Sequence, residues 1–62
     1  MKVYRAMAYG FDSTGFIIAA NTWEEAFEIA CDAGMGGVDH DDVWELRELS
    51  TSQTVSGVIE QF

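Results

Sequence analysis

The residues best suited to chemistry lie in one short acidic stretch, Asp39-His40-Asp41-Asp42. Carboxylate oxygens and an imidazole nitrogen can bind zinc or harder cations. However, consecutive side chains cannot all converge on one ion, and the sequence has no second histidine. The calcium-loop pattern, with Gly at its sixth position and Glu at its twelfth, is also absent. We therefore expect no metal site here, but a solvated turn in which Asp41 or Asp42 caps backbone groups.

Nucleophilic catalysis would need a reactive side chain, and the two candidates are Cys31 and His40. Cys31 falls in the apolar half of a predicted helix, where a small core residue is expected. His40 is the only histidine and lies in a predicted loop. A carboxylate pair for acid–base catalysis would need a pocket, for which a core of this size leaves little room. We therefore predict that the chain has no catalytic residues, is not an enzyme and binds no cofactor.

The segment Gly34-Met35-Gly36-Gly37 has the composition of a phosphate-binding loop. In such loops the glycines precede a helix, whose N-terminal amides bind the phosphate, and a lysine often completes the site. Here the glycines follow the predicted helix, no lysine accompanies them and acidic residues flank them. We expect no phosphate site, and we expect Gly34 to be the C′ residue that ends the helix.

Acidic side chains are concentrated in one part of the sequence. The stretch from Glu24 to Glu48 has nine acids and a single base, Arg47, so it carries the whole net charge of −8, and the charged residues outside it cancel. These nine acids are the candidate partner-binding residues: Glu24, Glu25, Glu28, Asp32, Asp39, Asp41, Asp42, Glu45 and Glu48.

The spacing of these acids matches the spacing of charges on a nucleic acid. Glu24, Glu28 and Asp32 follow one another at i,i+4, which is about 6 Å of helix rise per step. Alternate residues on a strand, such as the one that carries Glu45 and Glu48, are roughly 6.5 to 7 Å apart. Successive phosphates are separated by a similar distance, so a rigid row of carboxylates can occupy an Arg/Lys groove built for a phosphate backbone. The alternative is that the acids only keep a small protein soluble.

The overall composition restricts the classes of function. A net charge of −8 argues against direct binding to nucleic acid or to an anionic membrane, and it favours a basic protein partner. Hydrophobic residues make up 48% of the 62 residues, which suits one folded domain, residues 1–62. A single cysteine cannot form an internal disulfide, which favours a cytoplasmic location. No apolar run approaches the roughly 18 to 20 residues of a membrane span, and we expect no signal peptide.

A helix is the best-defined element in the sequence. Thr22 and Glu25 have the spacing of a capping box, in which each side chain accepts a backbone N–H of the other residue. Over residues 23–33, at about 100° per residue, apolar side chains fill one broad face and acids the opposite arc.

Alternating side chains predict strands on both sides of this helix. Residues 2–9 alternate, the turn residues of 10–15 follow, and the apolar strand at about 16–20 is expected to be central. Residues 43–49 alternate as a third strand, and residues 54–62 are expected to form an edge strand. The predicted fold is therefore α+β: a ββαββ chain that forms an antiparallel sheet with one helix packed on one face.

Faces can be assigned within the last two strands. Trp44 and Leu46 are expected on the face opposite Val43, Glu45 and Arg47. In the edge strand, alternation places Val58 and Phe62 on one face, and Gly57 can form a bulge.

Aromatic side chains exceed what the core can bury. We expect Trp23 and Trp44 in the core or at its edge, and some of the others on the second face of the sheet. Such a surface suits a protein-binding patch; a homodimer through that face or through the last strand is equally compatible with it. The other large aromatics are Tyr4, Tyr9, Phe11, Phe16 and Phe62.

The strand Phe16-Ile17-Ile18-Ala19-Ala20, the helix that starts Asn21-Thr22-Trp23-Glu24-Glu25 and the strand Val43-Trp44-Glu45-Leu46-Arg47 share a layout with a known group of proteins. Over about residues 16–48 the chain resembles very small phage-encoded inhibitor proteins. These include several anti-CRISPR proteins and the small phage inhibitor of bacterial RNA polymerase. The resemblance implies a stoichiometric inhibitor without catalytic residues, and acidic anti-CRISPR proteins often act as DNA mimics.

The charge pattern and the resemblance together predict a DNA-mimicking inhibitor of the anti-CRISPR type. Its nine acids would replace target-DNA phosphates in a basic site of a type I CRISPR effector complex, in the cytoplasm of the host cell if a phage encodes it. The partner would be a Cas protein, with no direct contact to nucleic acid or membrane, and the chain would be a monomer or a homodimer. The alternative is a small acidic interaction module, an adaptor or an RNA polymerase inhibitor, that binds through its aromatic face or edge strand.

Overall fold

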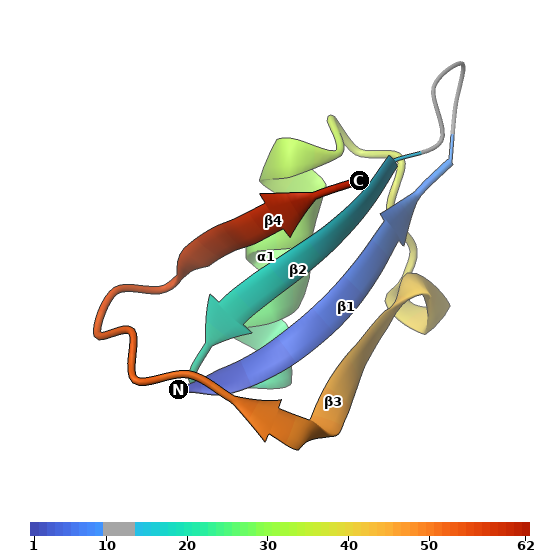
Figure 1. The fold of residues 1–62 in the computed structure, drawn as a ribbon. Coiled ribbons are helices and arrows are strands. Elements are labelled where there is room, and N and C mark those ends of the chain that lie inside the picture. Colours follow the sequence, from blue (N-terminus) through green and yellow to red (C-terminus); the bar gives the residue numbers. More distant parts are fainter. Residues whose placement is uncertain (10–13) are drawn as a thin grey trace.

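A computed structural model describes residues 1–9 and 14–62 of the chain (Figure 1). Most of the predicted turn at residues 10–15, and Phe11 within it, lie outside the described residues. The order of the strands and of the main helix is as predicted. The elements are β1 (Lys2–Ala8), β2 (Thr14–Ala20), α1 (Trp23–Ala33), the 3₁₀-helix η1 (His40–Asp42), β3 (Val43–Ser50) and β4 (Gly57–Gln61).

The four strands form one antiparallel sheet in the order β3-β1-β2-β4. β1 and β2 are central and pair along their whole length, from Lys2 opposite Ala20 to Ala8 opposite Thr14. Helix α1 lies across one face of the sheet (Figure 1), which confirms the predicted α+β fold of ββαββ order. We call this the helix face, and we call the opposite face, which no helix of the described residues covers, the open face.

The core lies between α1 and the helix face. Alternation along β1 and β2 sends every second side chain toward α1, where these side chains are buried. Half of the core residues are alanines, and their small side chains let the helix lie close to the strands, while Phe16 and Ile18 supply most of the volume. The core residues are Tyr4, Ala6, Ala8, Phe16, Ile18, Ala20, Ala26, Ala30, Val38 and Val43.

The cap at the start of α1 differs in one bond from the predicted capping box. The Glu25 N–H donates to Thr22 Oγ1 at 3.2 Å, as predicted. The Glu25 carboxylate accepts a bond from the Asn21 N–H at 3.3 Å instead of one from Thr22. The cap therefore begins one residue earlier, and Glu25 has a structural role at the helix N-terminus.

The chain reversal after α1 corrects the prediction for Gly34. Its φ is −88°, and the left-handed conformation falls on the next two residues, Met35 with φ +55° and Gly36 with φ +83°. Glycine is needed at position 34 for space: a Cβ there would lie 2.8 Å from Val38 Cγ2 and 2.9 Å from the Cβ of Ala8. Close packing between the end of α1 and the sheet therefore selects this glycine.

Strand β4 is an edge strand, as predicted, but its bulge lies elsewhere. Its pairing with β2 shifts register between Val58 and Glu60, which leaves Ile59 as the extra residue, and not Gly57 as predicted. The shift reverses the alternation of the side chains. Val58 therefore lies on the helix face and Phe62 on the open face, whereas alternation alone places them on the same face.

The surplus of aromatic side chains reaches the surface. Tyr4 and Phe16 are buried, whereas Tyr9, Trp44 and Phe62 are 60%, 41% and 54% exposed. Trp23 packs against the core, as expected. Trp44 lies opposite Arg5 and not on the helix face with Val43, which corrects the expectation that it lies in the core or at its edge.

Stability at alkaline pH is expected to depend on Tyr4. Burial raises the pKa of its hydroxyl above the ordinary value of 10.0; Lys2 opposes this increase, and the carboxylate of Glu45 adds to it. The unfolded chain therefore loses this proton at a lower pH, so the contribution is complete below about pH 10 and is lost as the pH rises from there. Urea unfolding on both sides of this pH should show a smaller alkaline loss in Tyr4→Phe than in the original chain. The exposed Tyr9→Phe is the control, and an unchanged alkaline loss in Tyr4→Phe would contradict the expectation.

Candidate protein-binding surface

Three acids project from the outer side of α1. At about 100° per residue, Glu24, Glu28 and Asp32 fall away from the side that packs on the sheet, and all three are exposed. Glu25 is half-buried, and its carboxylate accepts the cap bond from Asn21. The helix therefore contributes three free carboxylates, and the fourth predicted acid mainly stabilises the helix.

A stack of three rings fixes η1 beside α1. The His40 ring lies 4.7 Å from the Phe27 ring at an angle of 14°, and Phe27 lies 5.3 Å from the Trp23 ring at 17°. The Trp23 indole N–H donates to the Val43 carbonyl at 2.9 Å, which ties the start of α1 to the start of β3. Sequence reasoning missed this role of His40, although aromatics at i,i+4 on a helix are a recognisable signal.

The predicted acidic loop contains the 3₁₀-helix η1. Asp42 Oδ2 accepts the Asp39 N–H at 3.0 Å, which confirms that Asp42 caps a backbone group. Asp39 and Asp41 are exposed, whereas Asp42 is half-buried. Because the His40 ring stacks on Phe27, η1 lies beside α1, and the exposed Asp39 and Asp41 flank this contact in the sequence.

We define the acidic surface as the exposed acids of α1 and of the neighbouring segment that forms and caps η1. The chain between Trp23 and Asp42 contains no Lys or Arg. Both ion pairs of the described residues involve a different acid, Glu45. No Lys or Arg among the described residues therefore forms an ion pair with this surface. The acidic surface consists of Glu24, Glu28, Asp32, Asp39 and Asp41.

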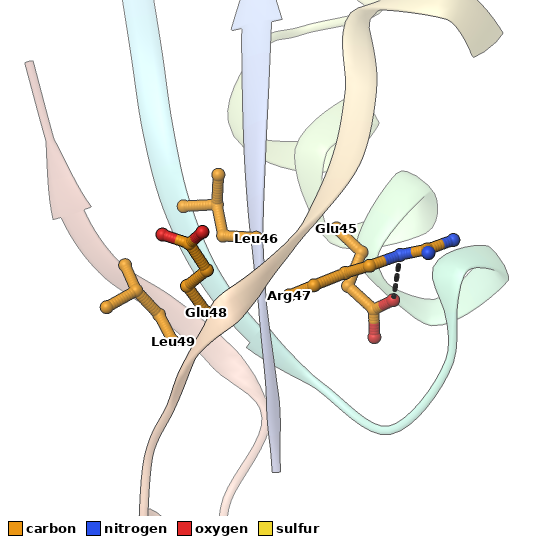
Figure 2. Close-up of a pocket in the computed structure, with 5 residues that line it drawn as sticks. All are labelled: Glu45, Leu46, Arg47, Glu48 and Leu49. Atoms are coloured by element: carbon orange, nitrogen blue, oxygen red, sulfur yellow. Dashed lines mark ion pairs between the residues drawn. The ribbon is translucent and has the colours of Figure 1, made fainter.

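The two predicted acids of β3 differ from those of the acidic surface in pairing or in position. Glu45 accepts Lys2 Nζ at 3.6 Å and Arg47 Nε at 3.7 Å, so two cations offset its charge. Glu48 projects from the side of β3 opposite to Glu45 (Figure 2). The structure therefore does not bring Glu48 together with the acids of the helix.

A hollow of about 360 Å³ lies along β3 and is lined by residues 45–49 (Figure 2). Its lining comes from one continuous stretch, where the pairing of β3 with β1 is irregular between Lys2 and Tyr4. Neither Cys31 nor His40 belongs to the lining. The hollow therefore does not bring a candidate nucleophile together with groups from other elements.

Possible metal ligands of the described residues do not converge on one point. Within residues 1–9 and 14–62, no group of three or more His, Cys, Asp or Glu side chains is arranged to hold a metal ion. The His40 ring stacks on Phe27, and Cys31 Sγ lies 3.9 Å from the Val38 carbonyl oxygen, partly buried against the core.

Comparison of the chain with protein-family models, curated proteins and solved structures found no match. Across the described part of the chain, no helix has the length and apolar character that crossing a membrane requires. Any functional conclusion therefore depends on the acidic surface and the open face.

Proposed function

We propose that the chain is a stoichiometric protein inhibitor whose acidic surface occupies a nucleic-acid-binding site on a basic partner protein. The observation that carries this proposal is the acidic surface itself. It presents five exposed carboxylates, and none of them belongs to an ion pair of the described residues. The stack of Trp23, Phe27 and His40 holds α1 and η1 together, so the carboxylates are positioned before a partner arrives.

The mechanism is substitution of carboxylates for phosphates. Glu24, Glu28 and Asp32 advance by about 6 Å per step along α1, which suits Lys and Arg side chains arranged for a phosphate backbone. Asp39 and Asp41 extend the charge onto η1. Glu45 contributes less because Lys2 and Arg47 offset it, and Glu48 lies outside the contact.

For the target we favour the DNA-binding site of a type I CRISPR effector complex. Support comes from the strand–helix–strand layout, which resembles that of small phage-encoded inhibitors, together with the acidic surface. In that setting the chain acts in the cytoplasm of the host cell. It binds a Cas protein, makes no direct contact with nucleic acid and blocks binding of the target duplex.

Competition with DNA tests this function. A purified type I effector complex should bind either the chain or its target duplex but not both. Because several ion pairs form at once, affinity for the chain should fall by roughly 100-fold between about 50 and 200 mM salt. Fluorescence anisotropy of labelled duplex is measured at each salt concentration with and without the chain. It reports whether the chain displaces the duplex and how the affinity for the chain depends on salt. A ternary complex, or an affinity that does not respond to salt, would contradict the proposal.

The open face favours one alternative, a small interaction module that acts as an adaptor or as an inhibitor of RNA polymerase. Tyr9 and Phe62 are more than half exposed, and exposed aromatics are common at protein interfaces. Strand addition at an edge is less favoured, because register shifts interrupt the pairing of both β3 and β4. In that case Phe62→Ala would abolish association, and the acids would be dispensable.

A further inference from the structure

Arg5 lies at the centre of an aromatic cluster on the open face. Its guanidinium carbon is 5.7 Å from the centre of the Trp44 ring and 5.2 Å from that of the Phe62 ring, within the range of a cation–π contact. Gly15 makes room for Phe62, because a Cβ at this position would lie 2.6 Å from Phe62 Cε2. Trp44 of the edge strand β3 and Phe62, the residue after the edge strand β4, therefore hold one cation in the middle of the sheet.

This cation lacks a carboxylate partner among the described residues. Arg5 Nε is buried and has no hydrogen-bond partner. The two ion pairs of the described residues use Lys2 and Arg47 instead. A guanidinium is suited to bind a carboxylate through two parallel bonds, and a buried donor without an acceptor is unfavourable. The cluster therefore has an unused capacity for an anion.

An unpaired carboxylate lies on the same face, in the same row across the sheet. Trp44 is opposite Arg5, Arg5 is opposite Ile17, and Ile17 is opposite Glu60. Adjacent strands are about 4.8 Å apart, so Glu60 lies two strands, or roughly 10 Å, from Arg5. Glu60 is exposed and belongs to neither ion pair of the described residues. A cation and an anion thus flank Ile17 on an uncovered surface.

We infer that a second copy of this chain docks on the open face, with Glu60 of each copy paired with Arg5 of the other. A two-fold axis that runs parallel to the strands and passes over Ile17 brings both pairs together at once. It also packs Ile17 against its counterpart in the second copy. Sheets that pack face to face are about 10 Å apart, a gap that Arg and Glu side chains can span together. Such a self-complementary contact is typical of two-fold dimers.

The area of the open face and the position of the acidic side chains agree with a second copy of the chain as the partner. The molecule measures 33 × 19 × 19 Å, so one broad face covers roughly 600 Å², near the lower end of the surface that each partner buries in a stable interface. Three of the five acids of the acidic surface belong to α1, which lies behind the sheet, so these negative charges of the two copies stay apart in the dimer. The inference is independent of the proposed inhibitory function.

Charge exchange at the two positions tests the dimer. Sedimentation equilibrium of the original chain should give a mass about twice the monomer value of 6.9 kDa. Glu60→Arg places like charges opposite each other at both pairs and should raise the dimer dissociation constant by about 100-fold. Arg5→Glu should do the same. An equimolar mixture of these two variants should dimerise again, because each pair in the mixed dimer joins an Arg of the first variant to a Glu of the second.

The control is Glu28→Arg, which makes the same charge change as Glu60→Arg on the opposite side of the molecule and should leave the dimer intact. Circular dichroism checks that each variant is folded. If Arg5→Glu does not fold, the dimer dissociation constants of Glu60→Arg and Glu28→Arg are sufficient to test the inference. The inference is overturned by a 6.9 kDa species at every concentration, which would leave the open face to a different protein. A Glu60→Arg dimer as tight as the original would also overturn it.

Discussion

Ile18→Ala is expected to lower the free energy of unfolding by about 2–5 kcal/mol. Ile18 is fully buried in the central strand β2, beneath α1. Truncation removes buried methyl groups and leaves a cavity that a closely packed layer of alanines fills poorly. A domain of this size has only roughly 3–9 kcal/mol of stability in total. Urea denaturation followed by far-ultraviolet circular dichroism should therefore show a variant that is partly unfolded without denaturant.

Ile59→Ala is the matched control, because the same atoms are removed from a different environment. Ile59 is 44% exposed and is the extra residue of the bulge in β4. Its truncation should cost less than about 1 kcal/mol. Equal losses at the two positions would mean that the layer under α1 is not the main source of stability.

Glu28→Lys is expected to weaken binding to the basic partner by about tenfold, whereas Glu48→Lys should change it by less than about twofold. Both substitutions change the net charge equally, so any difference between their effects on affinity depends on where the charge lies in the molecule. Glu28 lies on the acidic surface, whereas Glu48 lies on β3 and projects from the side of that strand opposite to Glu45 (Figure 2). Isothermal titration calorimetry with the isolated partner, at one fixed salt concentration, measures the two dissociation constants.

Charge reversal at Glu28 together with Asp32 should have a larger effect, about 100-fold in affinity, with the thermal midpoint within a few degrees of the original. Both side chains are exposed on α1, and a Lys near the helix C-terminus interacts favourably with the helix dipole. Equal effects of Glu28→Lys and Glu48→Lys would show that only net charge matters. An unchanged affinity in the double variant would exclude the acidic surface as the contact.

Local patterns predicted the elements of this fold well, because the determinants of each element are adjacent in sequence. The spacing of Thr22 and Glu25 located the start of α1, and alternation located the strands. The faces of β4 could not be predicted, because one bulge residue, Ile59, reverses the alternation. A bulge depends on the partner strand as well as on the sequence that contains it.

The candidate site was predictable only where it lies on a single element. Helical spacing placed Glu28 and Asp32 correctly on the outer side of α1. The position of η1 depends on His40 stacking over Phe27, and the partial neutralisation of Glu45 depends on Lys2 from the distant strand β1. These contacts join residues that are far apart in sequence, so composition and periodicity do not reveal them.

Every residue of the acidic surface belongs to one connection, the segment that leaves β2 after Ala20 and enters β3 at Val43. The four strands supply the platform but none of these carboxylates. Substitutions within this one continuous segment can therefore change the acidic surface without altering the strands. This segment is anchored on the sheet mainly by Trp23, Ala26, Phe27 and Ala30, so the charge that the molecule presents can be redesigned while these four residues keep the segment in place.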